Sequence, residues 1–223
     1  MNGPISGLEA AHERHIARRR ARVLSQHLAE IIPHDASLLD VGCGDGEIAC
    51  MVGRTRPDLK FRGVDVLVRP QTLIPVELYD GVTLPCADNA YDVVTLIDVL
   101  HHCDKPKDVL REAGRVARQA VAIKDHVREG FAAEATLRLM DWVGNHRHGV
   151  ALPYNYWRSS EWKNAFVELG MIVERLSGRL GLYPWPASLL FDRSLHFVAR
   201  LAPPREESVH SITAEVGPVH AIV

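Results

Sequence analysis

A glycine-rich turn, LLDVGCGDG at residues 38–46, constrains the fold of this chain more than any other feature. It follows a short apolar run, 37–41, that predicts a buried strand, and it precedes a segment, 46–52, that predicts the start of a helix. Glycines at such a junction permit a tight turn and let a ligand approach the backbone closely. In open α/β sheets the same junction opens onto the crevice where ligands bind. We therefore expect a ligand site here.

Predicted strands and helices alternate along the chain. Strand patterns cover residues 37–41, 60–66, 74–79, 91–97, 120–124, 171–176 and 195–201, and helical patterns cover residues 12–32, 107–117 and 160–169. This alternation is typical of βαβ units and predicts an α/β fold: a Rossmann-like, mostly parallel, seven-stranded sheet with helices on both faces. The last two strands have no long helix between them, which predicts an antiparallel edge strand. The first helix would form a helical N-terminal cover.

The length of 223 residues fits one domain with a small insertion. We expect this domain to span residues 1–202. The stretch from about 126 to 157 does not fit the alternation, so we interpret it as a lid insertion over the carboxyl edge of the sheet. Residues 203–223 are polar, contain proline and lack a periodic pattern, which predicts a disordered tail.

Composition and charge narrow the functional classes. The formal net charge is -2, so no global basic field would attract nucleic acid, and we expect no DNA partner. The four cysteines form no CxxC pair, which favours reduced thiols in a reducing compartment. We find no apolar run long enough to span a bilayer and no secretory signal, and we expect a cytoplasmic protein.

Acidic residues surround the glycine turn and indicate the kind of ligand. Asp40 precedes the glycines, Asp45 lies among them, and Asp65 ends the second predicted strand. A carboxylate at Asp65 can accept hydrogen bonds from both ribose hydroxyls of an adenosine. The GxGxG spacing and the acids disfavour a pyrophosphate, which binds to bare N–H groups and the helix dipole. A cationic adenosine ligand with an amino group therefore fits better than NAD or ATP.

Four segments in order resemble the class I S-adenosylmethionine (SAM)-dependent methyltransferases, specifically the small-molecule branch often called type 11. They are LLDVGCGDG at 38–46, GVDV at 63–66, YDGVTLPCADNAYDVV at 79–94 and IDVLHHCDKPKDVLREAGRV at 97–116. The resemblance covers roughly residues 37 to 125. It implies SAM as cofactor and S-adenosylhomocysteine as product.

The resemblance also implies a set of cofactor-binding residues. Asp65 would hold the ribose, and Asp80 would lie near the adenine amino group, although Gly81 follows it where many relatives have alanine. The other residues would surround the methionine part, its ammonium and the sulfonium. The full set is Asp40, Gly42, Cys43, Gly44, Asp65, Val66, Asp80, Gly81, Ile97 and Asp98.

The acceptor side is less specified, because methyl transfer needs little beyond alignment of the nucleophile and exclusion of water. A base is required only if the acceptor must lose a proton. The candidate catalytic residues are His101, after the fourth strand, and Asp125 and His126, after the fifth. We expect His102 only to cap or pack the following helix.

The insertion places aromatic side chains close together in the sequence. Trp142, His148, Tyr154 and Tyr156 are candidate substrate-binding residues, because aromatics on a lid can enclose a flat or apolar acceptor. His146 and His148, with His126, are conceivable metal ligands, but clusters in a chain with 12 histidines are more often coincidental. We expect no metal.

These observations predict methyl transfer from SAM to a small, apolar or aromatic metabolite, with O-methylation favoured because bases are available. One alternative is an RNA or other nucleic-acid methyltransferase that uses the arginine-rich helix around residues 14–22. Another is a non-catalytic SAM-binding partner protein. The glycine spacing disfavours a dehydrogenase.

Overall fold

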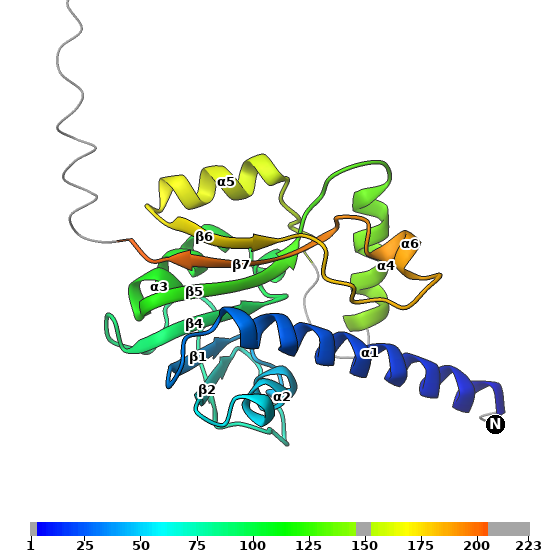
Figure 1. Ribbon diagram of the computed structural model, residues 1–223, viewed down its shortest axis with the longest axis horizontal. Helices are drawn as coiled ribbons and strands as arrows, with labels where there is room; N and C mark the ends of the chain where they lie inside the picture. Colours follow the sequence, from blue (N-terminus) through cyan, green and yellow to red (C-terminus); the bar gives the residue numbers. More distant parts are fainter. Residues whose placement is uncertain (1–3, 146–152, 205–223) are drawn as a thin grey trace, which may run out of the picture.

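A seven-stranded sheet forms the centre of the molecule in a computed structural model that describes residues 4–145 and 153–204 (Figure 1). The strand order is β3-β2-β1-β4-β5-β7-β6. The strands are β1 Ser37–Val41, β2 Lys60–Asp65, β3 Val76–Leu78, β4 Tyr91–Ile97, β5 Ala117–His126, β6 Ile172–Ser177 and β7 His196–Ala202.

Strands β1 to β5 pair in parallel, and β7 pairs antiparallel with both β5 and β6. The predicted fold class is therefore confirmed. The antiparallel strand lies one position inside the edge, because β7 is inserted between β5 and β6.

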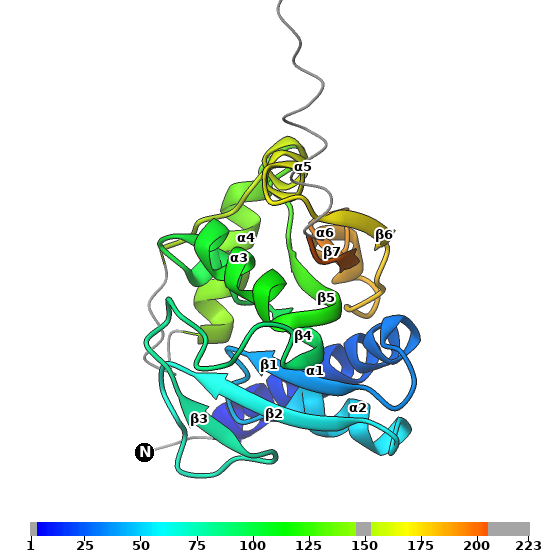
Figure 2. The ribbon, with the colours of Figure 1, turned by 90° about the vertical axis from the view of Figure 1, so that its left-hand side faces the viewer.

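Helices cover both faces of the sheet. They are α1 Pro4–Ile31, α2 Glu47–Thr55, α3 Pro106–Val116, α4 Ala133–Asn145, α5 Ser159–Glu168 and α6 Ser188–Phe191, with a 3₁₀ turn, η1, at Leu100–His102. In Figure 2, α1 and α2 lie on one side of the sheet and α3 lies on the other. Because side chains alternate along a strand, β1 contributes Leu38 to the core beneath α1 and α2, and Leu39 and Val41 to the core beneath α3 and α5.

Most helices and strands lie where the periodicity of the sequence predicts them, but some of their boundaries differ from the predicted ones. The strand at 91–97 is confirmed as β4, whereas α1 begins earlier than the predicted helix at 12–32 and β5 extends beyond the predicted 120–124. The predicted lid contains a helix, α4, that the sequence pattern did not predict. The division into a domain of 1–202 and a tail stays a prediction, and residues 205–223 lie outside the described residues. In the described part of the chain, no helix is both long and apolar enough to cross a bilayer.

Parallel strands place their carboxyl ends at the same edge of the sheet. The glycine turn follows β1, Asp65 ends β2, Asp98 follows β4 and His126 ends β5. The fold therefore gathers the residues that the sequence singled out along one edge.

Candidate active site

The glycine turn after β1 has a backbone conformation that requires glycine. Gly42 and Gly44 have φ values of 67° and 61°, in the left-handed region. A Cβ atom on Gly42 would lie 2.6 Å from Cγ2 of Val99, so the position also lacks space for a side chain. The N–H of Gly44 donates to Oδ2 of Asp65 at 2.8 Å, and the N–H of Leu67 donates to Oδ1 at 2.9 Å. These hydrogen bonds fix the carboxylate of Asp65 relative to the glycine turn.

A cavity of ≈ 700 Å³, which we call the larger cavity, opens beside this turn. Seven of the ten residues expected to bind the cofactor line it: Gly42, Gly44, Asp65, Val66, Asp80, Gly81 and Asp98. Sequence reasoning missed Arg69, Tyr79, Val99 and Cys103, which also line it. Tyr79, Val99 and Cys103 belong to the motif segments but carry no distinctive spacing of their own, and Arg69 lies between two of these segments.

The other three expected cofactor residues, Asp40, Cys43 and Ile97, do not line this cavity. The Thr95 hydroxyl donates to the buried carboxyl of Asp40 at 2.6 Å. Burial, together with the nearby charge of Asp65, raises the pKa of Asp40 to about 7. Burial also raises the pKa of the Cys43 thiol, to about 12, so it stays protonated. These side chains support the turn from behind.

Asp80 lines the larger cavity. Its Oδ1 accepts hydrogen bonds from the N–H groups of Val82 and Thr83 at 2.8 and 2.7 Å. These bonds lower the pKa of Asp80, so the carboxylate stays ionised. The second oxygen, Oδ2, has no hydrogen-bond donor among the described residues and is available to an amino group.

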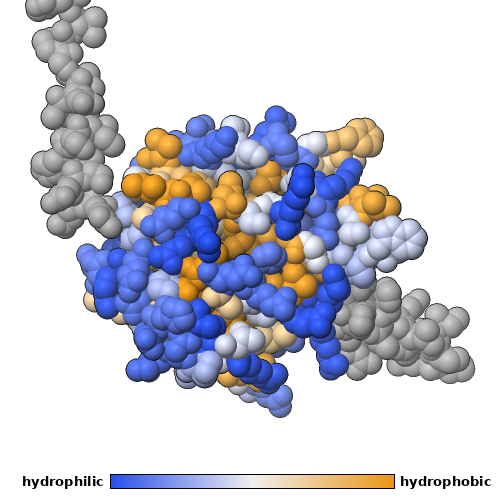
Figure 3. Space-filling view, viewed as in Figure 1, coloured by the Kyte–Doolittle hydropathy of each residue, from blue (hydrophilic) through white to orange (hydrophobic). Residues whose placement is uncertain are grey.

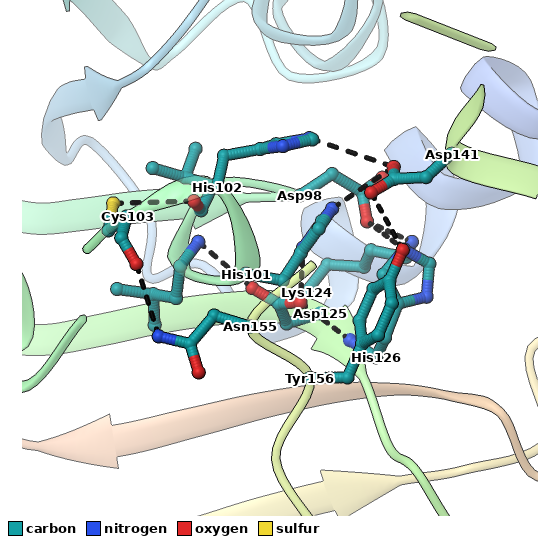
Figure 4. Close-up of polar contacts among 12 residues, drawn as sticks. Asp98, His101, His102, Cys103, Lys124, Asp125, His126, Asp141, Asn155 and Tyr156 are labelled. Atoms are coloured by element: carbon teal, nitrogen blue, oxygen red, sulfur yellow. Dashed lines mark hydrogen bonds and ion pairs between the residues drawn. The ribbon is translucent and has the colours of Figure 1, made fainter. Parts of the chain in front are cut away.

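A buried network centres on His101 of η1 (Figure 4). Its Nδ1 lies 2.7 Å from Oδ1 of Asp125, and its Nε2 lies 3.3 Å from Oδ1 of Asp141. Burial opposes the charge on the ring, but the two carboxylates outweigh it and raise the pKa of His101 to about 10. His101 is therefore an imidazolium at neutral pH, and both of its ring nitrogens donate.

Asp141 connects α4 to the end of β4. The Tyr156 hydroxyl donates to its Oδ2 at 2.7 Å, and Nε2 of His102 lies 3.7 Å from its Oδ1. Burial opposes ionisation, but the imidazolium of His101 lowers the pKa of Asp141. Sequence reasoning missed this residue, because no local spacing signals a contact between positions 101 and 141.

A second group of charges surrounds Asp98, directly after β4. Its φ of 56° is left-handed, which is uncommon outside glycine, and its N–H donates to the Lys124 carbonyl at 2.8 Å. Its carboxylate contacts the ammonium of Lys124, a fully buried side chain, and lies 3.8 Å from Arg20. Burial opposes ionisation, but Lys124 and Arg20 hold the pKa of Asp98 below its usual range.

A smaller cavity of ≈ 260 Å³ lies between α1, α2, α4 and the carboxyl ends of β4 and β5. Its apolar wall consists of Ala21, Leu24, Ile48, Met140 and Leu182, and its polar wall consists of Arg20, Glu47, Asp98, His102, Lys124, His126 and Asp141. Asp98 and His102 also line the larger cavity. The two cavities therefore meet at the end of β4.

The expected catalytic residues take different places. His126 lines the smaller cavity, whereas His101 and Asp125 line neither cavity. His102, which we expected only to pack, lines both. Burial and the imidazolium of His101 lower the pKa of His102, so its ring is neutral, and its buried Nδ1 has no hydrogen-bond partner among the described residues.

None of the described substrate-binding candidates lines either cavity. Tyr156 is buried and holds Asp141, Tyr154 lies beneath the guanidinium of Arg138 at 4.4 Å, and Trp142 is half exposed. His148, with His146, lies outside the described residues. These assignments stay predictions.

Some of these side chains are of the kinds that bind metal ions. Ligand atoms of Asp98, His101, Asp125 and His126 lie within 4.8 Å of one another. The two carboxylates already have cationic partners, Lys124 and the imidazolium of His101. Ion pairs within the described chain therefore account for this cluster.

Comparison with known proteins decides the family. A model of the methyltransferase domain matches residues 12–175. The chain belongs to the methyltransferase-domain family. Together with the sheet order, this makes it a class I methyltransferase, and SAM is its cofactor, as in the SAM-dependent enzymes of the same fold.

Known relatives match this methyltransferase over part of their length. The 27-O-demethylrifamycin SV methyltransferase of Amycolatopsis mediterranei is 31% identical over 110 residues, 43% of this chain and 40% of that protein. Methyltransferase GfsG of Streptomyces halstedii is 29% identical over 136 residues, 49% of each chain. The matches thus span less than half of these relatives. The PH0226 protein of Pyrococcus horikoshii has the same fold, with a TM-score of 0.62, 16% identity and coverage of 84% and 91%.

The larger cavity fits SAM by its own chemistry. Gly42 and Gly44 leave their backbone uncovered by a side chain, Asp65 offers a carboxylate for the ribose hydroxyls, and Asp80 offers a free oxygen for an amino group. Asp98 also lines this cavity, where its carboxylate pairs with Lys124 and Arg20.

Proposed function

We propose that this methyltransferase transfers the methyl group of SAM to a small molecule bound in the smaller cavity. The supporting observation is that the two cavities meet at Asp98 and His102. When bound, SAM supplies an electrophilic methyl group on its sulfonium. The chain contributes alignment and exclusion of water, which supply most of the catalysis in such a displacement.

The cofactor side rests on Asp65 and Asp80. Asp65 accepts hydrogen bonds from the ribose hydroxyls, and Asp80 accepts one from the adenine amino group through Oδ2. Gly42 and Gly44 allow close approach of the methionine part, and Asp40 keeps the turn in place through Thr95. Asp98, held by Lys124 and Arg20, forms part of the cavity wall where the two cavities meet.

The smaller cavity favours an acceptor with an apolar body and a polar reacting group. Its lining combines apolar side chains, including Leu24 and Met140, with the polar side chains of His102 and His126. An apolar or aromatic metabolite with a hydroxyl suits both walls, and this supports O-methylation. Tyr156 acts on this site indirectly, through Asp141, and Trp142 and Tyr154 belong to the lid segment outside the cavity lining.

His102 is the group best placed to remove a proton from the acceptor. Its ring is neutral, and it lies where the cavities meet. An unprotonated imidazole can accept a proton and so serve as a general base. His101 is already protonated, so it and Asp125 are positioning residues. Oδ2 of Asp125 accepts the N–H of Leu100 at 3.1 Å and thereby fixes η1. His126 orients the acceptor.

Replacement of Asp65 tests the cofactor assignment. Asp65→Ala removes the ribose contact, and we expect its affinity for S-adenosylhomocysteine to fall roughly a hundredfold, as for loss of a charged hydrogen-bond pair. Calorimetric titration measures this effect, with Asp58→Ala, just before the start of β2, as control. Unchanged affinity would refute the ribose role.

Replacement of His102 tests the chemistry. Methyl transfer is followed as incorporation from labelled SAM into a small-molecule cell extract. We expect His102→Gln to lower incorporation about 10²- to 10³-fold while leaving binding of S-adenosylhomocysteine intact. A wild-type protein that binds SAM but labels no molecule would instead support the non-catalytic alternative.

A further inference from the structure

A basic groove of ≈ 530 Å³ lies between α1 and α2, beside the smaller cavity. Arg18, Arg19 and Arg22 of α1 and Arg54 of α2 line it. Among the described residues, Glu47 is the one acid in this lining. Hydrophilic side chains cover most of the face that carries α1 and α2 in Figure 3.

The four arginines of the basic groove differ from others in the molecule because they lack a carboxylate partner among the described residues. Arg56, Arg115 and Arg200 each contact a carboxylate at 2.6 to 2.7 Å. In the described part of the chain, no carboxylate lies within 4.0 Å of any groove arginine. Arg19 donates from Nη2 to the Gly181 carbonyl at 3.3 Å, and its buried Nε has no hydrogen-bond partner among the described residues. The groove therefore concentrates positive charge that the described carboxylates do not pair with.

Unpaired guanidinium groups suit a phosphate. Arginine presents a planar fork of N–H donors that binds phosphate oxygens in pairs, and several such groups together offset a double negative charge. In the smaller cavity, Lys124 and Arg20 are less available to a phosphate, because both already pair with the carboxylate of Asp98. An anionic group would thus be held in the groove and not in the smaller cavity.

The groove and the smaller cavity are neighbours. Arg19 and Arg20 are consecutive on α1, and one lines the groove while the other lines the smaller cavity. Glu47, at the start of α2, lines both. A ligand that passes Glu47 can reach both sites at once.

We propose that the basic groove binds the phosphate group of the methyl acceptor, so that the substrate class is a phosphorylated small molecule. This inference rests on the proposed function. The acceptor places its phosphate among Arg18, Arg22 and Arg54 and its reacting group beside His102. The carboxylate of Glu47 repels a phosphate and so disfavours the reversed orientation. The formal net charge of -2 disfavours a nucleic-acid polymer as the ligand of the same arginines.

Binding of inorganic pyrophosphate tests the groove. Calorimetric titration is carried out at constant ionic strength on the wild type, on Arg22→Gln/Arg54→Gln, and on Lys163→Gln, an exposed cation of α5 on the opposite face. We expect the double variant to bind at least roughly tenfold more weakly, because two charge-assisted contacts are lost, and the control to match the wild type. All three proteins should bind S-adenosylhomocysteine equally. Equal pyrophosphate binding by all three would overturn the proposal.

Dephosphorylation of the acceptor pool tests the substrate class. The small-molecule extract is treated with alkaline phosphatase, the phosphatase is removed, and labelling from SAM is compared with that of the untreated extract. We expect labelling to fall at least roughly tenfold. Unchanged labelling would contradict a phosphorylated acceptor. The same conclusion would follow if the protein bound an RNA oligonucleotide in a salt-dependent way, if pyrophosphate did not compete with the RNA, and if the double variant lost this binding. Absence of labelling in the untreated extract would contradict the proposed function and the acceptor assignment with it, while the pyrophosphate titration would still decide the groove.

Discussion

The two cavities that meet at Asp98 and His102 are built in different ways. The larger one is formed by turns that directly follow strands, and its shape depends on backbone conformation at Gly42 and Gly44. The smaller one is formed by side chains from α1, α2 and α4, which are far apart in the sequence. Cofactor recognition is therefore a local property of the sheet edge, whereas the acceptor side depends on how the covering helices pack.

The largest effect is expected from a substitution at Gly42, which should weaken cofactor binding in the larger cavity. Gly42→Ala puts a Cβ atom 2.6 Å from Val99 Cγ2 in a left-handed backbone, so the turn must move. We expect binding of S-adenosylhomocysteine to fall more than roughly a hundredfold, since the ligand approaches this backbone directly. Calorimetry measures the change.

Gly130→Ala is the matched control for Gly42→Ala. Gly130 also has a left-handed backbone, with φ of 89°, but nothing lies within 4 Å of an added Cβ atom. We expect it to lose about 1–2 kcal/mol of stability and no affinity. Equal losses of affinity at both glycines would show that the turn has no special role.

A smaller effect is expected from Asp141, on the acceptor side. Asp141→Asn leaves the buried imidazolium of His101 with one carboxylate and weakens the contact between α4 and η1. We expect the free energy of unfolding to fall by about 2–3 kcal/mol and methyl transfer to fall with it, while affinity for S-adenosylhomocysteine stays within twofold. Urea unfolding and calorimetry measure both quantities.

Tyr156→Phe serves as the graded control, because it removes one neutral donor to the same carboxylate. We expect Tyr156→Phe to lower the free energy of unfolding by about 1 kcal/mol. If Asp141→Asn weakens cofactor binding as strongly as it weakens catalysis, the two sides of the site are not independent.

A further expected effect is a dependence of stability on pH. The pKa of His101 is about 10 in the folded protein and near 6.5 when unfolded, so folding favours the protonated ring. Its contribution to stability is complete below pH 6.5 and is lost as pH rises toward 10. We expect the free energy of unfolding to fall more steeply from pH 7 to 9.5 in the wild type than in His101→Gln, as measured by urea titrations. If the free energy of unfolding falls equally with pH in both proteins, His101 is not protonated in the folded state.

The same division explains how much could be predicted from the sequence. The glycine turn, Asp65 and the β4 strand depend on spacing within a few residues, and periodicity reveals them. Asp141 and His101 are 40 positions apart, and their contact depends on where α4 packs. Tyr156 was assigned to the substrate because it is aromatic, but its hydroxyl binds Asp141. The protonation states of His101 and His102 could not be predicted from the sequence, because each depends on that packing.

The position of β7 has a consequence for folding. β7 lies between β5 and β6, so β6 has no neighbour in the sheet until residues 196–202 have been synthesised. During translation, the hydrogen-bonding edge of β5 is open throughout the synthesis of α4, α5 and β6. Strand β7 therefore completes the sheet late, after long-range chain closure, and the open edge of β5 opposite β4 is exposed to aggregation until that step.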